Sequence, residues 1–289
     1  MDIGALYPAD DDFKARARKH QAQYRAEVLG VEWDTYGNRL TKKDGEALLI
    51  YYDKLGVREA KIRRFPDYSS KRDGDMLRSE HIPFNMFGPL QTNADLAKQV
   101  LGKLIGREIA DLLALEFEWA PEPRELYLGD RTAFDVYACL KPKDQQIRCI
   151  GLGIEVKYTE RGYPIGNTES KRVADHDSLY WCVTRKSGAF VPDGYGALAS
   201  DDLRQIWRNH LLGLAMRIHG DINDFVSVTL YPAGNTHFTN ALAAYRAHLS
   251  AEARNSLLGR TYESYFEALG GDNSIMNWRE YLQSRYVVR

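Results

Sequence analysis

Two residues that could do chemistry together, a glutamate and a lysine, lie in a stretch that otherwise has the pattern of a buried strand. In the run Ile150–Tyr158 hydrophobic residues occupy every second position, and successive side chains of a strand point to opposite faces. Glu155 and Lys157 therefore share the other face with Gly151 and Gly153. Glycines inside a strand often mark the close approach of a ligand. This face is predicted to offer space, a carboxylate and a cation, which suits a metal ion and an anionic substrate.

A second carboxylate lies in the preceding alternating segment. Asp135 is a polar position of the run 131–139, and Lys141–Asp144 has the composition of a turn. The two strands are therefore predicted to form a hairpin that sets Asp135 beside Glu155. Two such acids can hold Mg²⁺ or Mn²⁺, which would activate a water, while Lys157 orients that water and offsets charge on a phosphate. The alternative is an exposed Glu–Lys pair with an unrelated surface acid.

Asp135, followed by Gly153-Ile154-Glu155-Val156-Lys157, resembles the signature of the PD-(D/E)XK nuclease superfamily, an acid on one strand and E-x-K on the next. That superfamily includes restriction endonucleases, phage-type exonucleases, recombination nucleases and bacterial defence effectors. The resemblance covers about residues 79 to 232 and departs from the pattern where Thr132-Ala133-Phe134 replaces the frequent proline. It implies an α/β fold with a restriction-endonuclease-like αβββαβ core, a mixed central sheet and metal-dependent hydrolysis of phosphodiester bonds.

The elements that must position these residues can be read from hydrophobic spacing. Apolar residues recur at three- and four-residue intervals from Leu96 to Leu112, which predicts a helix capped by Thr92 or Asn93. The same pattern predicts a helix over Asp202–His219, and Phe225–Tyr231 has the pattern of a strand. The order helix, strands, helix, strand is typical of an α/β core.

Three regions follow from this order. Residues 1–78 are expected to form a helical and basic N-terminal extension, 79–235 the nuclease core, and 236–289 a helical C-terminal region packed on that core.

Further candidate residues lie on the predicted 202–219 helix and before the first long helix. Gln205, Arg208 and Asn209 occur at i, i+3 and i+4, so they share one face of their helix. The resemblance implies that Gln205 joins the catalytic site, that Arg208 and Asn209 contact the substrate, and that Glu80 adds a third metal-binding carboxylate. The alternatives are a solvent-facing polar stripe and, for Glu80, an acid at a helix start after a Ser79 cap.

A basic segment, Lys61–Arg78, contains interleaved aromatic residues, which is typical of a groove that follows a phosphate backbone. Arg63 and Arg64 are the predicted DNA contacts in it, and the polar loop Glu160–Asp177 is a second candidate. The alternative for the basic segment is an ordinary solvated loop.

The bulk composition limits the class of protein. The chain has 289 residues, 44% hydrophobic and 27% charged, with a formal net charge of -1, as in ordinary globular proteins. A near-neutral charge argues against a protein that coats DNA passively, but it leaves room for an enzyme with a local basic groove. Cys139, Cys149 and Cys182 form no C-x-x-C motif and are expected to be reduced thiols of a cytoplasmic protein without signal peptide or membrane segment.

These observations predict a Mg²⁺- or Mn²⁺-dependent endonuclease that cuts DNA, of the restriction or phage-defence kind. RNA is the less favoured substrate, and a homodimer or a defence-system partner protein is compatible with such a role. The alternative is a catalytically silent module of the same fold that binds DNA or a protein partner.

Overall fold

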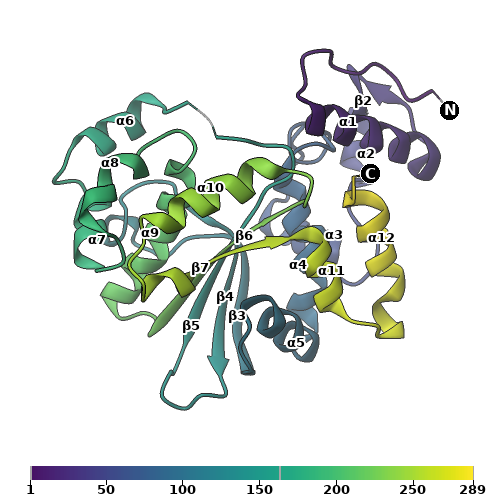
Figure 1. Ribbon diagram of the computed structural model, residues 1–289. Helices are drawn as coiled ribbons and strands as arrows, with labels where there is room; N and C mark the ends of the chain where they lie inside the picture. Colours follow the sequence, from purple (N-terminus) through teal and green to yellow (C-terminus); the bar gives the residue numbers. More distant parts are fainter. Residues whose placement is uncertain (1, 163, 289) are drawn as a thin grey trace.

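The computed structural model describes residues 2–162 and 164–288, and within them five strands form one mixed sheet in the order β3-β4-β5-β6-β7 (Figure 1). The antiparallel strands are β3 (Ile109–Trp119), β4 (Phe134–Pro142) and β5 (Ile150–Val156). β6 (Asp224–Tyr231) and β7 (Leu257–Thr261) then continue the sheet in parallel with β5. With one long helix before β3 and another before β6, this order confirms the predicted αβββαβ core and mixed sheet.

Helices cover both faces of the sheet, and each face has its own hydrophobic core. One core contains Val136, Ile154 and Val228 from the strands. It is covered by helices α4 (Ile82–Thr92), α5 (Ala94–Ile105), α11 (Tyr262–Leu269) and α12 (Met276–Tyr286). The other contains Tyr137 and Phe225. It is covered by helices α7 (Leu179–Lys186), α9 (Arg204–His219) and α10 (Thr236–Ala247).

The predicted hairpin is present, with its turn later than expected. β4 and β5 pair antiparallel with Val136 opposite Ile154, and their connection lies at the bottom of Figure 1. Lys141 and Pro142 continue β4, and the chain turns over residues 143–149. Pairing carries the strand through these two residues, because β3 extends far enough to pair with both.

The first long helix is shorter than predicted. Asn93 caps α5 by accepting a hydrogen bond from the N–H of Leu96, as expected, but the helix ends at Ile105. Gly106 follows with a φ of 69°, the left-handed conformation that commonly closes a helix. Ile109 and Leu112 therefore belong to β3 and not to the helix. Their spacing continued the helical pattern by coincidence across a turn.

The chain before the core folds into short elements that pack on its right-hand side in Figure 1. They are α1 (Asp12–Tyr24), the π-helical turn η1 (Arg25–Leu29), β1 (Trp33–Asp34), β2 (Tyr36–Leu40), α2 (Lys42–Glu46), α3 (Val57–Arg64) and the short 3₁₀ helix η2 (Ser79–His81). The basic segment is thus partly helical, and Lys61 is not a solvated residue of it. Its ammonium is buried in an ion pair with Asp73 at 3.2 Å.

The remaining elements surround the site or close the sheet. Four short helices connect the core strands along the chain: η3 (Arg124–Leu126) between β3 and β4, and α6 (Asn167–Ala174), η4 (Pro192–Gly194) and α8 (Tyr195–Leu198) between β5 and β6. Two more, η5 (Ala253–Ser256) and η6 (Asn273–Ile275), come after β6. The C-terminal region is mostly helical, as expected, but it also contributes β7 to the central sheet.

Cys139 and Cys149 are joined as a disulfide between the hairpin strand β4 and the residue before β5, which differs from the expectation of three reduced thiols. The hairpin pairing places their Cα atoms 6.4 Å apart, and sequence spacing alone did not indicate that proximity. Cys182 is a free thiol.

Among the described helices, none is both long and apolar enough to cross a membrane.

Candidate active site

The three residues of the predicted signature lie together at one end of the hairpin strands. Asp135 is the second residue of β4, Glu155 is next to last in β5, and Lys157 follows that strand. Asp135 Oδ2 accepts a hydrogen bond of 2.6 Å from the backbone N–H of Val156. Lys157 Nζ lies 2.6 Å from Glu155 Oε1, and both side chains are largely buried. The pair is therefore not an exposed Glu–Lys pair on a solvated sheet face.

The backbone of Lys157 is fixed from two sides. Its N–H donates to the carbonyl of Leu230 on β6 at 2.8 Å, which extends the parallel pairing past the end of β5. Its carbonyl accepts a hydrogen bond of 2.7 Å from the hydroxyl of Tyr262, at the start of α11. The backbone of Lys157 therefore cannot turn its side chain to the other face of the sheet without breaking buried hydrogen bonds.

Two amides from α9 complete the contacts of Glu155. Gln205 Nε2 donates to Glu155 Oε1 at 2.6 Å, and Asn209 Nδ2 donates to Oε2 at 2.7 Å. The i, i+4 spacing that placed them on one helix face therefore directs both toward the sheet. Glu155 has a donor on each oxygen, which holds its carboxylate in one orientation.

Arg208 lies on the same helix, at the edge of this group. Its guanidinium donates to Thr132 Oγ1 at 2.9 Å and to Glu169 Oε1 at 3.0 Å, and it lies 3.5 Å from Asp130 Oδ2. The helix thus carries Arg208 to the loop that precedes Asp135. Its predicted contact with a phosphate stays a prediction.

Two more glutamates belong to this neighbourhood: the charge of Glu118 acts on Asp135, and the charges of Glu155 and Glu80 act on Glu118. Glu80, on η2, has its Oε2 buried with no hydrogen-bond partner in the described part of the chain. Glu118, on β3, was not singled out from the sequence. The pairing of β3 with β4 brings it level with Asp135, because the residues on either side of Glu118 pair with those on either side of Asp135. Its φ of 48° is unusual for a residue with a side chain.

The sequence contains a pattern that could have indicated Glu118 as a strand residue. Leu115, Phe117 and Trp119 alternate with Glu116 and Glu118, which is the pattern of a strand with one polar face. The helix predicted through Leu112 hid that pattern.

The electrostatics of the site reflect many acids and few cations. Burial raises the pKa of Asp135 well above its usual value, and the carboxylates of Glu155 and Glu118 raise it further. Burial and the nearby Glu155 raise the pKa of Glu118 to about 7. For Lys157, burial lowers the pKa, but the charges of Glu155 and Asp135 outweigh it, so the net shift is upward. Lys157 is therefore a charged ammonium in this structure.

The donor set fits a hard divalent cation, because it consists of carboxylate oxygens with one buried oxygen left without a partner. Among residues 2–162 and 164–288, however, no three His, Cys, Asp or Glu side chains are arranged as a ready metal site. Like charges repel in the absence of a cation, and Lys157 neutralises Glu155 in its place. The assignment of Asp135, Glu155 and Glu80 as metal ligands stays a prediction.

The glycines beside Glu155 serve the hydrophobic core and leave no space for a ligand, contrary to the expectation. A side chain at Gly153 would overlap the ring of Phe134, and one at Gly151 would overlap Ile222. These aromatic and aliphatic side chains lie where the sequence suggested an opening.

A small cavity adjoins the site. A cavity of about 10 Å³, bordered by Glu155, Lys157, Gln205, Asn209 and Thr229, has room for about one water molecule.

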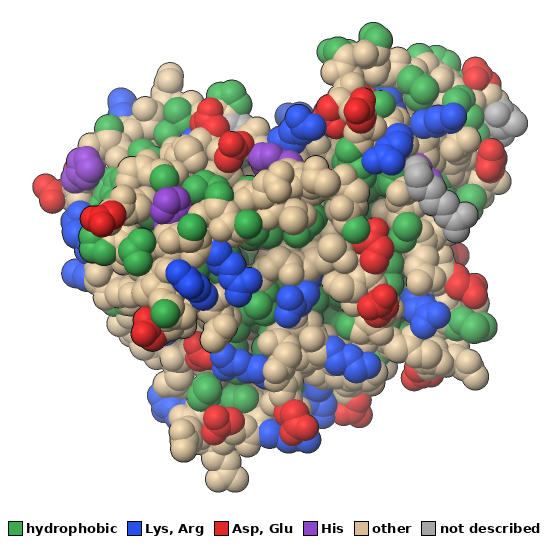
Figure 2. All heavy atoms as spheres, in the orientation of Figure 1, with side chains coloured by type: hydrophobic (Ala, Val, Ile, Leu, Met, Phe, Trp, Pro, Cys, Tyr) green, Lys and Arg blue, Asp and Glu red, His purple; other side chains and the backbone are tan. Residues whose placement is uncertain are grey.

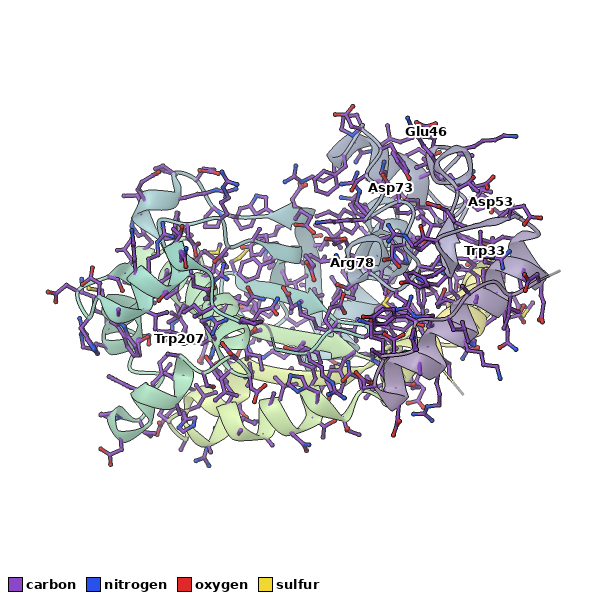
Figure 3. The ribbon with its side chains drawn as sticks, turned by 90° about the horizontal axis from the view of Figure 1, so that it is seen from above. Trp33, Glu46, Asp53, Asp73, Arg78 and Trp207 are labelled. Carbon is purple, nitrogen blue, oxygen red and sulfur yellow. A yellow bond between two sulfur atoms is a disulfide. The ribbon has the colours of Figure 1, made fainter. Side chains whose placement is uncertain are left out.

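On the larger scale, the surface has a notch at its upper edge between the N-terminal segment and the lobe with α6 and α8 (Figure 2). Viewed from above, Asp73 and Arg78 lie in one lobe and Trp207 in the other (Figure 3).

The two predicted DNA-contacting arginines of α3 differ in their surroundings. Arg63 is exposed. Arg64 donates to the carbonyls of Phe117 and Glu118 at 3.0 and 2.9 Å. Arg64 therefore holds the end of β3, and the structure does not bring either arginine into contact with Asp135 or Glu155.

Comparison with known protein families decides the affiliation. The model of the PD-(D/E)XK nuclease superfamily matches residues 8–288, nearly the whole chain. The chain belongs to the PD-(D/E)XK nuclease superfamily. Searches of curated proteins and of solved structures found no match. The superfamily supports a nuclease-type activity, and the match extends over the N- and C-terminal additions as well as the core.

Proposed function

We propose that the chain is a metal-dependent nuclease that hydrolyses DNA phosphodiester bonds, with Asp135, Glu155 and Lys157 as its catalytic residues. The observation that carries this proposal is the buried contact between Lys157 and Glu155 beside Asp135, in a chain of the PD-(D/E)XK superfamily. A protein that only binds DNA gains nothing from burying several like charges, which is costly. The arrangement is therefore better explained by catalysis.

Each residue has a distinct role in this proposal. Asp135 and Glu155, with Glu80, would hold Mg²⁺ or Mn²⁺, and the bound metal would polarise a phosphoryl oxygen and activate a water. Lys157 keeps its proton and offsets negative charge that develops on the phosphate. Gln205 and Asn209 fix the orientation of Glu155 through their hydrogen bonds.

Duplex DNA is the proposed substrate, and an endonuclease of the restriction or phage-defence kind acting in the cytoplasm is the proposed role. Arg208, Asn209, Arg63 and Arg64 are the proposed substrate contacts. A homodimer would bring two such sites to two strands, and a defence-system partner protein would supply recognition. RNA is the less favoured substrate.

A catalytically silent module that binds DNA or a protein partner is the second candidate. It is favoured by one observation: the lysine and two amides already occupy both oxygens of Glu155. Calorimetric titration with Mg²⁺ or Mn²⁺ separates the two candidates. The nuclease binds metal, and Asp135→Ala loses that binding; a silent module binds no metal at millimolar concentration.

Cleavage assays test the proposed function itself. Plasmid, linear duplex DNA, single-stranded DNA and RNA are incubated with Mg²⁺, Mn²⁺ or EDTA. Nicking or linearisation of the plasmid with metal, and none with EDTA, is the expected result. Folded protein that cuts none of these substrates would contradict the proposal.

A further inference from the structure

A basic pocket of about 650 Å³ lies beside the site, between α6, α9 and the loop that precedes β4. Its lining includes four arginines, and three carboxylates accompany them. The arginines are Arg124, Arg131, Arg172 and Arg208. Whether the pocket attracts anions depends on which of these charges remain available after the internal contacts are made.

Two of the three carboxylates are buried and used internally. The side chain of Asp130 is 7% exposed and lies beside Arg208. It accepts hydrogen bonds from the hydroxyls of Thr132 and Tyr180. Glu169, 13% exposed, contacts Arg204 at 3.2 Å and Arg208 at 3.0 Å. These acids fix Arg204 and Arg208 of α9 in place. The third carboxylate, Glu125, is exposed and forms no ion pair among the described residues, so the negative charge left in the pocket is that of Glu125 alone.

Two of the arginines keep their charge unneutralised. Arg172 donates to the carbonyl of Gly129 at 2.7 Å, and no carboxylate contacts it among the described residues. Arg131 is exposed, and no ion pair of it occurs in the part of the chain that the structure describes. Each guanidinium therefore retains donors that can bind an oxyanion.

The position of the pocket relates it to the site. Arg208 stands one helical turn from Gln205, which contacts Glu155. Thr132, which Arg208 contacts, precedes Asp135 by three residues. The same helix and the same loop thus border both the carboxylates and the basic pocket. A strand with its scissile phosphate at Asp135 and Glu155 would place neighbouring phosphates next to the arginines.

We propose that this arginine pocket binds a backbone phosphate of the strand being cut, next to the scissile phosphate. The inference rests on the proposed nuclease function and makes it more specific: the substrate is a polynucleotide held by at least two consecutive parts of its backbone. Arg131 and Arg172 provide the binding, and Asp130 and Glu169 position the pocket by holding Arg208.

Salt-dependent binding tests the pocket without requiring cleavage. In the Lys157→Ala background with Mg²⁺, the Kd of a fluorescent DNA duplex is measured across KCl concentrations. Adding Arg131→Gln and Arg172→Gln should weaken binding by roughly 10-fold and lower the slope of log Kd against log salt by about 0.9, one phosphate contact. Replacing single phosphates near the cut by neutral methylphosphonates should weaken binding to the Lys157→Ala protein but not to the arginine variant.

A matched control is available in the β4–β5 hairpin. Lys141→Gln with Arg148→Gln removes two exposed positive charges from the opposite end of the hairpin and should leave affinity and slope unchanged. If the arginine variant behaves like this control, or the Lys157→Ala protein binds no duplex at all, the pocket proposal is overturned. Cleavage by the wild-type protein is scored separately, so the nuclease proposal can stand when the pocket proposal fails.

Discussion

At the scale of the residue, the site combines one buried lysine with more acids than it can neutralise. Glu118 shows the consequence, because its pKa is raised to about 7 by burial and by Glu155. The folded protein therefore keeps a proton on Glu118 up to higher pH than the unfolded chain does. Stability associated with Glu118 is fully present below pH 4.5 and is lost as pH rises through 7.

Replacing Glu118 tests this directly. Glu118→Gln removes a charge that is costly only when it is ionised, so the variant should be more stable than wild type by roughly 2 kcal/mol at pH 8 and about equal near pH 4.5. Urea unfolding in EDTA at both pH values measures the difference. Glu116→Gln, an exposed neighbour on β3, is the control; equal effects of Glu118→Gln at both pH values would contradict the account.

Asn209 offers a second test at this scale. Its amide donates to Glu155 Oε2, so Asn209→Ala leaves that oxygen without its donor and the carboxylate held only through Oε1. Loss of such a supporting hydrogen bond is expected to reduce metal affinity or kcat/KM by about 10- to 100-fold. Asn240→Ala, an exposed asparagine of α10, should leave both unchanged. Activity of Asn209→Ala equal to that of the control would remove Asn209 from the site.

At the scale of the element, the sequence predicted most of the core but misplaced the turn of the β4–β5 hairpin and the boundary between α5 and β3. The pairing of the hairpin strands, α9 and β6 follow hydrophobic periods that are uninterrupted, so the pattern predicts these elements, although the hairpin turn lies later than predicted. The α5–β3 boundary was missed because Ile109 and Leu112 continue the helical spacing by chance, although Gly106 is a good helix terminator. Because β3 was not predicted, Glu118 was not recognised as a strand residue beside Asp135.

The contacts of the signature residues required the fold. Periodicity placed Gln205 and Asn209 on one helix face, but only the packing of α9 on the sheet shows that both bind Glu155. At Gly153 the sequence pattern predicted space for a ligand that the structure does not have. The sequence alone does not show whether the space beside a strand glycine is filled by a ligand or by another side chain. At Gly153 the ring of Phe134 fills it.

Gly153 can be tested by substitution. Gly153→Ala forces a methyl group against Phe134 in a well-packed core, so unfolding free energy should fall by about 1–3 kcal/mol. Gly196→Ala, in α8, meets no atom within 4 Å and should be neutral or slightly stabilising. Urea denaturation measures both. A wild-type stability for Gly153→Ala would show that the space beside Glu155 is open after all.

At the scale of the whole molecule, the N- and C-terminal additions form hydrogen bonds with the residues that follow β5. Gln21 on α1 donates to the hydroxyl of Tyr158 at 2.8 Å and to the carbonyl of Arg285 on α12 at 2.6 Å. Tyr262 binds the carbonyl of Lys157. Both ends of the chain therefore meet next to Lys157, in agreement with a family match that runs from residue 8 to 288.

The regions 1–78, 79–235 and 236–289 are accordingly not expected to fold separately. A fragment of residues 79–235 lacks β7 and the fully buried Trp278 and Tyr286. One face of its sheet therefore keeps α4 and α5 but loses the cover of α11 and α12. We expect no cooperative thermal transition and no near-ultraviolet circular dichroism from this fragment, whereas the full chain shows both. A fragment that melts cooperatively would establish an independent core.

The most direct test of the central claim is plasmid cleavage by wild type, Lys157→Ala and the surface control Lys141→Ala, each with Mg²⁺ and with EDTA. The account predicts metal-dependent cutting by wild type and Lys141→Ala, and a loss of at least about 100-fold in Lys157→Ala, whose fold is checked by circular dichroism. Cutting by Lys157→Ala at the wild-type rate would show that the catalytic site lies elsewhere.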